Sequence, residues 1–181
     1  MRLDPATTLL AVIDVQERLL AAMPDADRVV SRCSRLAEAA RLLGVRTVLT
    51  EQYPQGLGPT PRSLAATLPA AAAKIAFSCC GCGGFDAAIS SDVAAVVLAG
   101  LETHVCVAQT AFDLLARGLA VFVAVDAVGS RHAIDHDVAM RRLEAAGAVP
   151  TTSEAILFEW CRSADHPRFK DVRALVLDRP R

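Results

Sequence analysis

Three residues with reactive side chains are spread over the first two thirds of the chain: Asp14, Lys74 and Cys106. A thiolate can attack a carbonyl carbon, a carboxylate can take the thiol proton, and an ammonium group can favour the thiolate form. Together these groups would make a hydrolase that works through a covalent thioester. Singly, each has an ordinary explanation, because cysteine is usually core, aspartate often caps a helix and lysine is usually a solvated charge.

Short apolar runs alternate with helix-like segments along the chain, which indicates a parallel sheet with helices on both faces. Six strands are expected near residues 8–14, 45–51, 70–77, 93–100, 119–126 and 148–151. Helices are expected near residues 25–43, 85–91, 104–117, 134–146, 153–161 (with Ser153 as its N-cap) and 165–177, and a loop at 53–61. The prediction is one domain over residues 1–181, with a Rossmann-like three-layer α/β/α fold and a central, mostly parallel six-stranded sheet.

The predicted sheet would bring the reactive residues to one edge. Asp14 ends the first strand, Lys74 lies in the third, and Cys106 follows the fourth, at the start of the helix at 104–117. Open parallel sheets bind ligands outside the carboxyl ends of their strands. The first turn of that helix would offer N–H groups to an oxyanion. Its partial positive charge, with the Lys74 ammonium, would lower the pKa of the Cys106 thiol.

The composition narrows the classes of partner. The chain has 181 residues, a net charge of -1 and 53% hydrophobic residues. A near-neutral chain gives no electrostatic reason to bind nucleic acid or an anionic membrane. No apolar stretch has the length of a membrane span, and residues 1–10 lack the pattern of a secretory signal. We therefore expect a cytoplasmic protein whose partner is a small molecule.

A cluster of three cysteines, Cys79, Cys80 and Cys82, leaves two other possibilities open. Zinc sites usually have a second ligand pair at suitable spacing, and none is obvious in the sequence. A redox dithiol is the other alternative, although the surrounding glycines favour a flexible loop. We expect the cysteines of this chain to be ordinary reduced thiols.

Three segments resemble the isochorismatase-like cysteine hydrolases, a family that also contains nicotinamidases and N-carbamoylsarcosine amidases. The run Leu10-Ala11-Val12-Ile13-Asp14-Val15-Gln16 is similar to the family's opening strand and D-x-Q. Lys74, followed by Ala76-Phe77-Ser78, resembles the family's lysine segment. The segment Gly100-Leu101-Glu102-Thr103-His104-Val105-Cys106-Val107 resembles its Gly-x-x-Thr-x-x-Cys-Val motif. The similarity covers residues 8–163.

This resemblance implies a role for each matching residue. Asp14 would be the general base, Lys74 its cationic partner and Cys106 the nucleophile. It further implies a non-proline cis peptide at Leu101–Glu102, with the N–H groups of Glu102 and Cys106 as candidates for the oxyanion hole.

Four further residues are candidates for the substrate pocket: Gln16, Tyr53, Phe77 and Leu101.

One departure from the nicotinamidases is informative. Their D-x-H-x-x-H metal site follows the second strand, whereas residues 50–58 of this chain contain no histidine. We therefore expect neither a metal nor another cofactor, and nicotinamidase is disfavoured. Isochorismatase is also disfavoured, because its substrate is a dianion and the only basic residues expected near the site are Lys74 and Arg131. The segments 51–59 and 151–154 resemble the small isochorismatase-domain proteins.

The leading hypothesis is a hydrolase that cleaves the C–N bond of a small amide-like molecule through Cys106. The alternative is a non-catalytic oligomeric binding or scaffold protein of the same fold. A homo-oligomer is expected in either case, partly from the resemblance. An apolar stripe in the last helix could face a partner chain or pack back on its own domain; it comprises Phe169, Val172, Leu175 and Val176.

Overall fold

A six-stranded sheet forms the centre of the molecule, and every strand pair in it is parallel. The computed structural model describes residues 2–177. The strands are β1 (Thr8–Ile13), β2 (Arg46–Gln52), β3 (Ala72–Lys74), β4 (Ala95–Leu101), β5 (Ala120–Gly129) and β6 (Val149–Thr151). They lie in the order β3-β2-β1-β4-β5-β6. The predicted α/β fold is confirmed, with a sheet that is wholly parallel.

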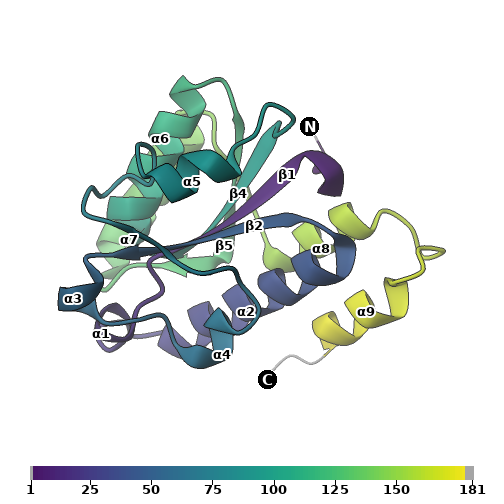
Figure 1. The fold of residues 1–181 in the computed structure, drawn as a ribbon, viewed down its shortest axis with the longest axis horizontal. Coiled ribbons are helices and arrows are strands. Elements are labelled where there is room, and N and C mark those ends of the chain that lie inside the picture. The colour runs from purple at the N-terminus through teal and green to yellow at the C-terminus, as the bar shows by residue number, and fades with distance from the viewer. Residues whose placement is uncertain (1, 178–181) are drawn as a thin grey trace.

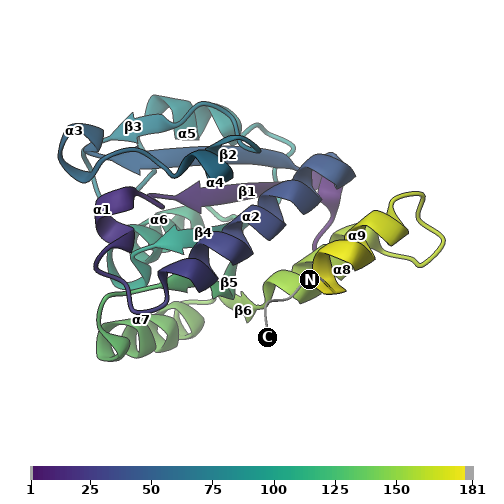
Figure 2. The ribbon, with the colours of Figure 1, turned by 90° about the horizontal axis from the view of Figure 1, so that it is seen from below.

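Helices cover both faces of the sheet and give three layers (Figure 1). One face carries α2 (Ala26–Leu43) and α8 (Ser153–Cys161), with α9 (Phe169–Leu177) packed on both of them. The other face carries α5 (Gly83–Ala88), α6 (Ala108–Ala116) and α7 (Ala133–Ala145). Figure 2 shows α2 running obliquely across the strands, with α8 and α9 next to it.

Short turns of helix lie around the carboxyl ends of the strands. They are α1 (Glu17–Leu20) and α3 (Pro54–Leu57), together with a π-helical turn at Thr103–Val107, whereas α4 (Arg62–Ala65) packs against α2. A 3-10 turn at Pro5–Thr7 precedes β1 at the opposite edge. Of these, α1 and α3 pack against each other beside the end of β1.

The core follows from the apolar pattern of the elements. Every residue of β1 and β4 is buried, as expected for central strands covered on both faces. Helix α2 buries Cys33, Leu36 and Ala40 at helical spacing and ends at Gly44, whose φ of 71° is the left-handed C-cap conformation. The periodicity of the sequence therefore fixes which face of α2 meets the sheet.

Three predicted boundaries were wrong for local reasons. The third strand ends at Lys74, because the chain then turns and the carbonyl groups of Ala76 and Phe77 accept hydrogen bonds from Lys74. The cap of α8 is Thr152 rather than Ser153, since the Ser153 hydroxyl donates to Asp126 instead. The segment expected as a loop at 53–61 contains α3, which has Pro54 at its start.

The apolar stripe of α9 packs on its own domain. Val172 is fully buried, and Phe169, Leu175 and Val176 are partly buried against the core formed with α2 and α8. Of the two alternatives for this stripe, the structure therefore shows the one in which the helix packs back on its own domain. Within residues 2–177, no helix is both long and apolar enough to cross a bilayer.

Gly100 allows β1 and β4 to approach closely just before the turn that carries Cys106. Its φ is +115°, and a Cβ atom at this position would clash with the carbonyl oxygen of Ile13 on β1. Only glycine fits such a contact without a shift of one strand.

We predict that Gly100→Ala lowers the free energy of unfolding by more than ~3 kcal/mol, because it adds a backbone clash to a strained φ. Gly118→Ala is the matched control, since Gly118 has a φ of +80° with nothing within 4 Å of the added Cβ. It should cost only ~1 kcal/mol. Urea denaturation measures both, and equal losses would contradict the close approach.

Candidate active site

Asp14 stands at the carboxyl end of β1, where the order of the strands changes direction. Its side chain is fully buried, and its φ of 51° is unusual for a residue other than glycine. Oδ1 accepts a hydrogen bond of 2.8 Å from the Thr50 hydroxyl on β2. Oδ2 accepts one of 2.6 Å from Nζ of Lys74. Both carboxylate oxygens are therefore fixed by neighbours on other strands.

Lys74 ends β3 and points back toward β1. Besides Asp14, its Nζ donates to Oε1 of Gln52 at 2.9 Å and to the carbonyl oxygens of Phe77 at 2.9 Å and Ala76 at 3.2 Å. Burial alone would lower the pKa of Lys74, but the Asp14 carboxylate and the nearby thiols outweigh it and raise that pKa. The ammonium is therefore charged and fully engaged, so Lys74 holds Asp14 in place rather than exchanging protons.

Cys106 lies in the π-helical turn that follows β4 and is almost completely buried. The pKa of its thiol is raised, first by burial and next by the Asp14 carboxylate, to which it is hydrogen-bonded; Lys74 opposes the shift without cancelling it. The expected lowering of this pKa was therefore wrong. The proton stays on the sulfur at rest, and Asp14 is the adjacent group that can accept it.

The turn around Cys106 is tied down on several sides. The Leu101–Glu102 peptide bond is cis. The Glu102 carbonyl oxygen accepts the N–H groups of Val105 at 3.0 Å and Val107 at 3.2 Å. The hydroxyl of Thr110, one helical turn further on, donates to the Cys106 carbonyl oxygen at 2.6 Å. These bonds fix the position of the sulfur relative to Asp14.

Cys106 opens into a cavity of about 300 Å³. The cavity is lined by Leu19, Gln52, Leu57, Phe77, Glu102, Val105, Cys106 and Arg131. Of the four pocket candidates from the sequence, Phe77 lines this cavity. The lining residues come from α1, β2, α3 and the segments that follow β3, β4 and β5, so the cavity lies over the carboxyl ends of the strands, as the sheet rule requires.

The other three candidates have different roles in the structure. Gln16 is buried and uses its amide to hold the carbonyl oxygens of Gln52 and Gly58, which anchors the chain after β2. Leu101 points into the core on the α2 side of the sheet. Tyr53 is half exposed and places its ring beside Gly56. None of the three is among the residues that line the cavity.

Sequence reasoning missed several lining residues. Gln52 ends β2 and could have been found by the rule that selected Asp14. The carboxylate of Glu102 and the apolar side chains of Leu19 and Leu57 had no such signal. Leu19 and Leu57 belong to the short helices α1 and α3, which contact each other only in the folded structure.

A second thiol lies behind the site. Cys79 is fully buried, and its sulfur is 3.7 Å from the hydroxyl of Thr50, the residue that also binds Asp14. Burial, followed by the Asp14 charge, raises the pKa of Cys79 to about 11. All six cysteines of the described chain are free thiols. Within residues 2–177, no group of three His, Cys, Asp or Glu side chains is arranged to hold a metal ion.

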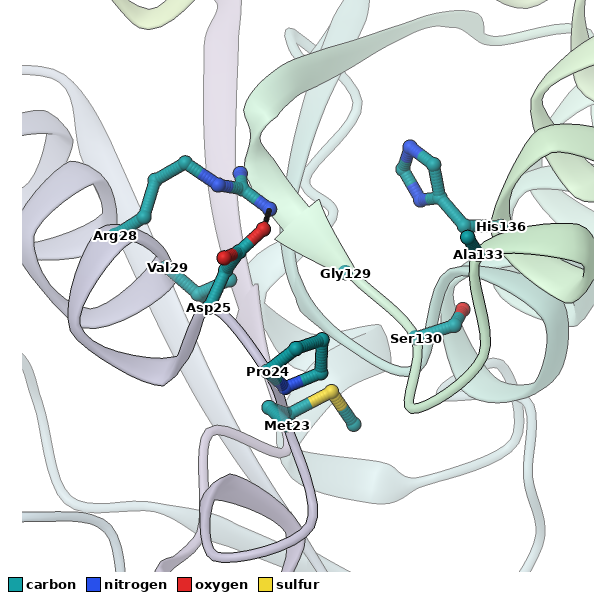
Figure 3. Close-up of a pocket in the computed structure, with 9 residues that line it drawn as sticks. All are labelled: Met23, Pro24, Asp25, Arg28, Val29, Gly129, Ser130, Ala133 and His136. Carbon is teal, nitrogen blue, oxygen red and sulfur yellow. Dashed lines mark ion pairs between the residues drawn. The ribbon is translucent and has the colours of Figure 1, made fainter.

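A separate pocket lies between the start of α2 and the end of β5 (Figure 3). There Asp25 and Arg28 form an ion pair of 3.6 Å, and Ser130 and His136 lie across from them. His136 Nδ1 is 3.0 Å from the hydroxyl of Thr103, so this pocket adjoins the back of the turn that carries the thiol. It contains none of the three reactive residues, and we therefore assign the chemistry to the cavity at Cys106.

Known proteins are similar to this chain along nearly its whole length. The isochorismatase domain model matches residues 8–155. Isochorismatase domain-containing protein 2 of Bos taurus is 42% identical over 175 residues, or 97% of this chain and 85% of that protein. The MAR1 ribonuclease structure from Caenorhabditis elegans has a TM-score of 0.94 at 40% identity, covering 100% of this chain and 95% of that chain. The YcaC protein of Escherichia coli, an octameric hydrolase of unknown specificity, has a TM-score of 0.84 at 26% identity, covering 98% and 95%.

We predict that Asp14→Asn shifts the alkylation of Cys106 by iodoacetamide to lower pH. The substitution removes a negative charge that raises the thiol pKa and leaves the opposing Lys74 charge, so the thiolate forms earlier as pH rises. Mass spectrometry of the Cys106 peptide from neutral to alkaline pH gives the rate. The partly exposed Cys80 in the same sample is the internal control. If the pH midpoint of Cys106 alkylation were unchanged or higher in Asp14→Asn, the contact between Asp14 and the Cys106 thiol would be contradicted.

Proposed function

Because the chain belongs to the isochorismatase family, we propose that it is a cysteine hydrolase that cleaves a C–N bond in a small amide-like molecule. Family membership supports hydrolase-type function, and the residues of the cavity support the chemistry. The observation that carries the proposal is the buried Asp14–Lys74 ion pair next to the Cys106 thiol. A protein that only binds or scaffolds needs none of these three groups.

The proposed reaction has two halves. In the first, Asp14 takes the thiol proton while the Cys106 sulfur attacks the amide carbonyl carbon, and the backbone N–H groups of Glu102 and Cys106 hold the oxyanion. Collapse of this intermediate breaks the C–N bond, and Asp14 returns the proton to the leaving amine. In the second, Asp14 takes a proton from water as the water oxygen attacks the thioester carbon. The C–S bond then breaks, Asp14 returns its proton to the Cys106 sulfur, and a carboxylic acid is released.

Lys74 supports both halves without donating a proton itself. Its ammonium group stays bonded to Asp14 and to three other acceptors, so it keeps the carboxylate in position. Its positive charge also favours the thiolate form of Cys106. The proposal needs no metal ion or cofactor.

A small molecule fits this site better than RNA does. The name of the Caenorhabditis elegans structure, MAR1 ribonuclease, describes that protein. RNA binding relies on a strongly basic surface, whereas this chain has a net charge of -1. The cavity at Cys106, at about 300 Å³, has the size of a pocket for a small molecule.

We also propose that the protein is a homo-oligomer, as is the octameric hydrolase from Escherichia coli. The stripe on α9 packs against its own domain, so we place the interface elsewhere. Ile75 and Phe77, which follow β3 beside the cavity, are 72% and 53% exposed. Exposed apolar side chains of this size often mark a contact surface, and here a second chain would also cover the rim of the cavity.

We predict that Cys106→Ala abolishes hydrolysis and leaves the fold intact, because the attacking atom is removed and a small apolar side chain replaces it. A library of small amides, read by ammonia release, identifies substrates for the test. Cys82→Ala, at a partly exposed thiol outside the cavity, is the control and should retain full activity. A Cys106→Ala variant that kept more than about a tenth of wild-type kcat, a loss below ~1.4 kcal/mol, would contradict the covalent mechanism.

We predict that the protein at micromolar concentration has a mass, measured by light scattering, of at least two chains of 19.1 kDa each. Ile75→Lys should lower this mass by placing a charge in the interface, whereas Leu177→Lys, at an equally exposed leucine on α9, should not. A wild-type mass of one chain would overturn the oligomer. If only Leu177→Lys lowered the mass of the assembly, the interface would instead lie on α9.

A further inference from the structure

An ion pair forms part of the wall of the cavity beside Cys106. Arg131 donates to the Glu102 carboxylate three times, from its backbone N–H at 3.0 Å, from Nε at 3.2 Å and from Nη2 at 2.7 Å. The Glu102 carboxylate is only 5% exposed, whereas the Arg131 side chain is 50% exposed. The glutamate is therefore held from both the backbone and the side chain of one residue, and it keeps the guanidinium turned toward itself.

This pair leaves the cavity without an unmatched charge. Glu102 and Arg131 are the charged residues among those that line it, and they neutralise each other. The deeper charges, Asp14 and Lys74, are matched in the same way. A carboxylate or phosphate on a substrate would have to compete with Glu102 for Arg131 and would meet the negative charge of Glu102. A cationic group would meet Arg131.

The rest of the wall is suited to apolar contact. Leu19, Leu57, Phe77 and Val105 supply aliphatic and aromatic surface. Gln52 is the neutral polar residue of the wall, and its amide is already engaged, with Nε2 donating to the Ile75 carbonyl oxygen and Oε1 accepting from Lys74. Apart from Arg131 and the Cys106 thiol, the side chains of the wall thus offer contact area rather than open hydrogen-bond partners.

Resting on the proposed hydrolase function, we infer that the substrate is a neutral carboxamide whose acyl part is a short alkyl chain or a single ring. The Glu102–Arg131 ion pair is the feature that rejects acyl groups with a second carboxylate. Discrimination against anions therefore comes from a side chain whose backbone also belongs to the proposed oxyanion site.

The test compares hexanamide with the monoamide of adipic acid, which has a carboxylate in place of the terminal methyl group. For the wild-type protein, kcat/KM from ammonia release should favour hexanamide by at least ~10-fold, the discrimination typical of one unfavourable contact. A wild-type preference for the adipic monoamide would overturn the inference while leaving the hydrolase function intact.

Two variants connect this preference to the ion pair. Glu102→Gln keeps the shape and the backbone but frees the charge of Arg131, so the ratio of kcat/KM values should move toward the adipic monoamide by at least ~10-fold. Glu102→Gln combined with Arg131→Gln removes both charges and should restore the wild-type ratio. Damage to the fold would lower both rates alike and leave the ratio unchanged, and an unchanged ratio in Glu102→Gln counts against the inference.

A binding measurement separates this inference from the hydrolase proposal. Calorimetry with the Cys106→Ala variant gives the dissociation constants of both amides without turnover. Tighter binding of hexanamide, with no hydrolysis by the wild-type protein, would support the neutral pocket and refute the hydrolase. Equal affinity, tighter binding of the anion, or no binding of either amide at millimolar concentration would refute the neutral apolar pocket.

Discussion

The buried ion pair between Asp14 and Lys74 is the constraint on which the rest of the site depends. The exposed fractions of the two side chains are 0% and 2%, so neither charge is solvated. Burial of a charge is tolerated only when it is paired and its remaining hydrogen-bond capacity is used. Strand β2, which separates β1 from β3, supplies the remaining hydrogen bonds. The Thr50 hydroxyl donates to Asp14, and the Gln52 side chain accepts from Lys74. The ion pair thus fixes one carboxylate orientation beside the thiol.

The same carboxylate explains why the site does not hold a preformed thiolate. A negative Asp14 opposes a second negative charge on Cys106, and Lys74 compensates for it only in part. In the proposed mechanism, nucleophile and base are therefore coupled, because the sulfur gains its charge as Asp14 loses its own. A thiol with a raised pKa reacts more slowly with oxidants and electrophiles at neutral pH, because the thiolate is the reactive form.

The sequence predicted the features that depend on local residue patterns and missed those that depend on contacts between residues far apart in the chain. The apolar runs predicted each strand, and the sheet rule pointed to the ends of β1, β3 and β4. The predicted direction of the pKa shift at Cys106 was wrong, because the shift depends on burial and on the balance of two charges distant in the chain, Asp14 and Lys74. The contact of Glu102 with Arg131, 29 residues apart, follows no sequence period, so only the folded chain reveals it.

The strand order also has a consequence for how the protein reaches its active form. Asp14 and Lys74 are 60 residues apart in the chain, and Cys106 comes from a third strand on the other side of β1. Parallel strands of this kind pair only after their crossover segments have formed, which makes their assembly a late, non-local event. Two opposite charges must lose water at that step, and each can do so only in the presence of the other. A chain emerging from the ribosome therefore cannot bring the three reactive residues together until β1, β2, β3 and β4 have met, and the appearance of the proposed activity during refolding would time that meeting.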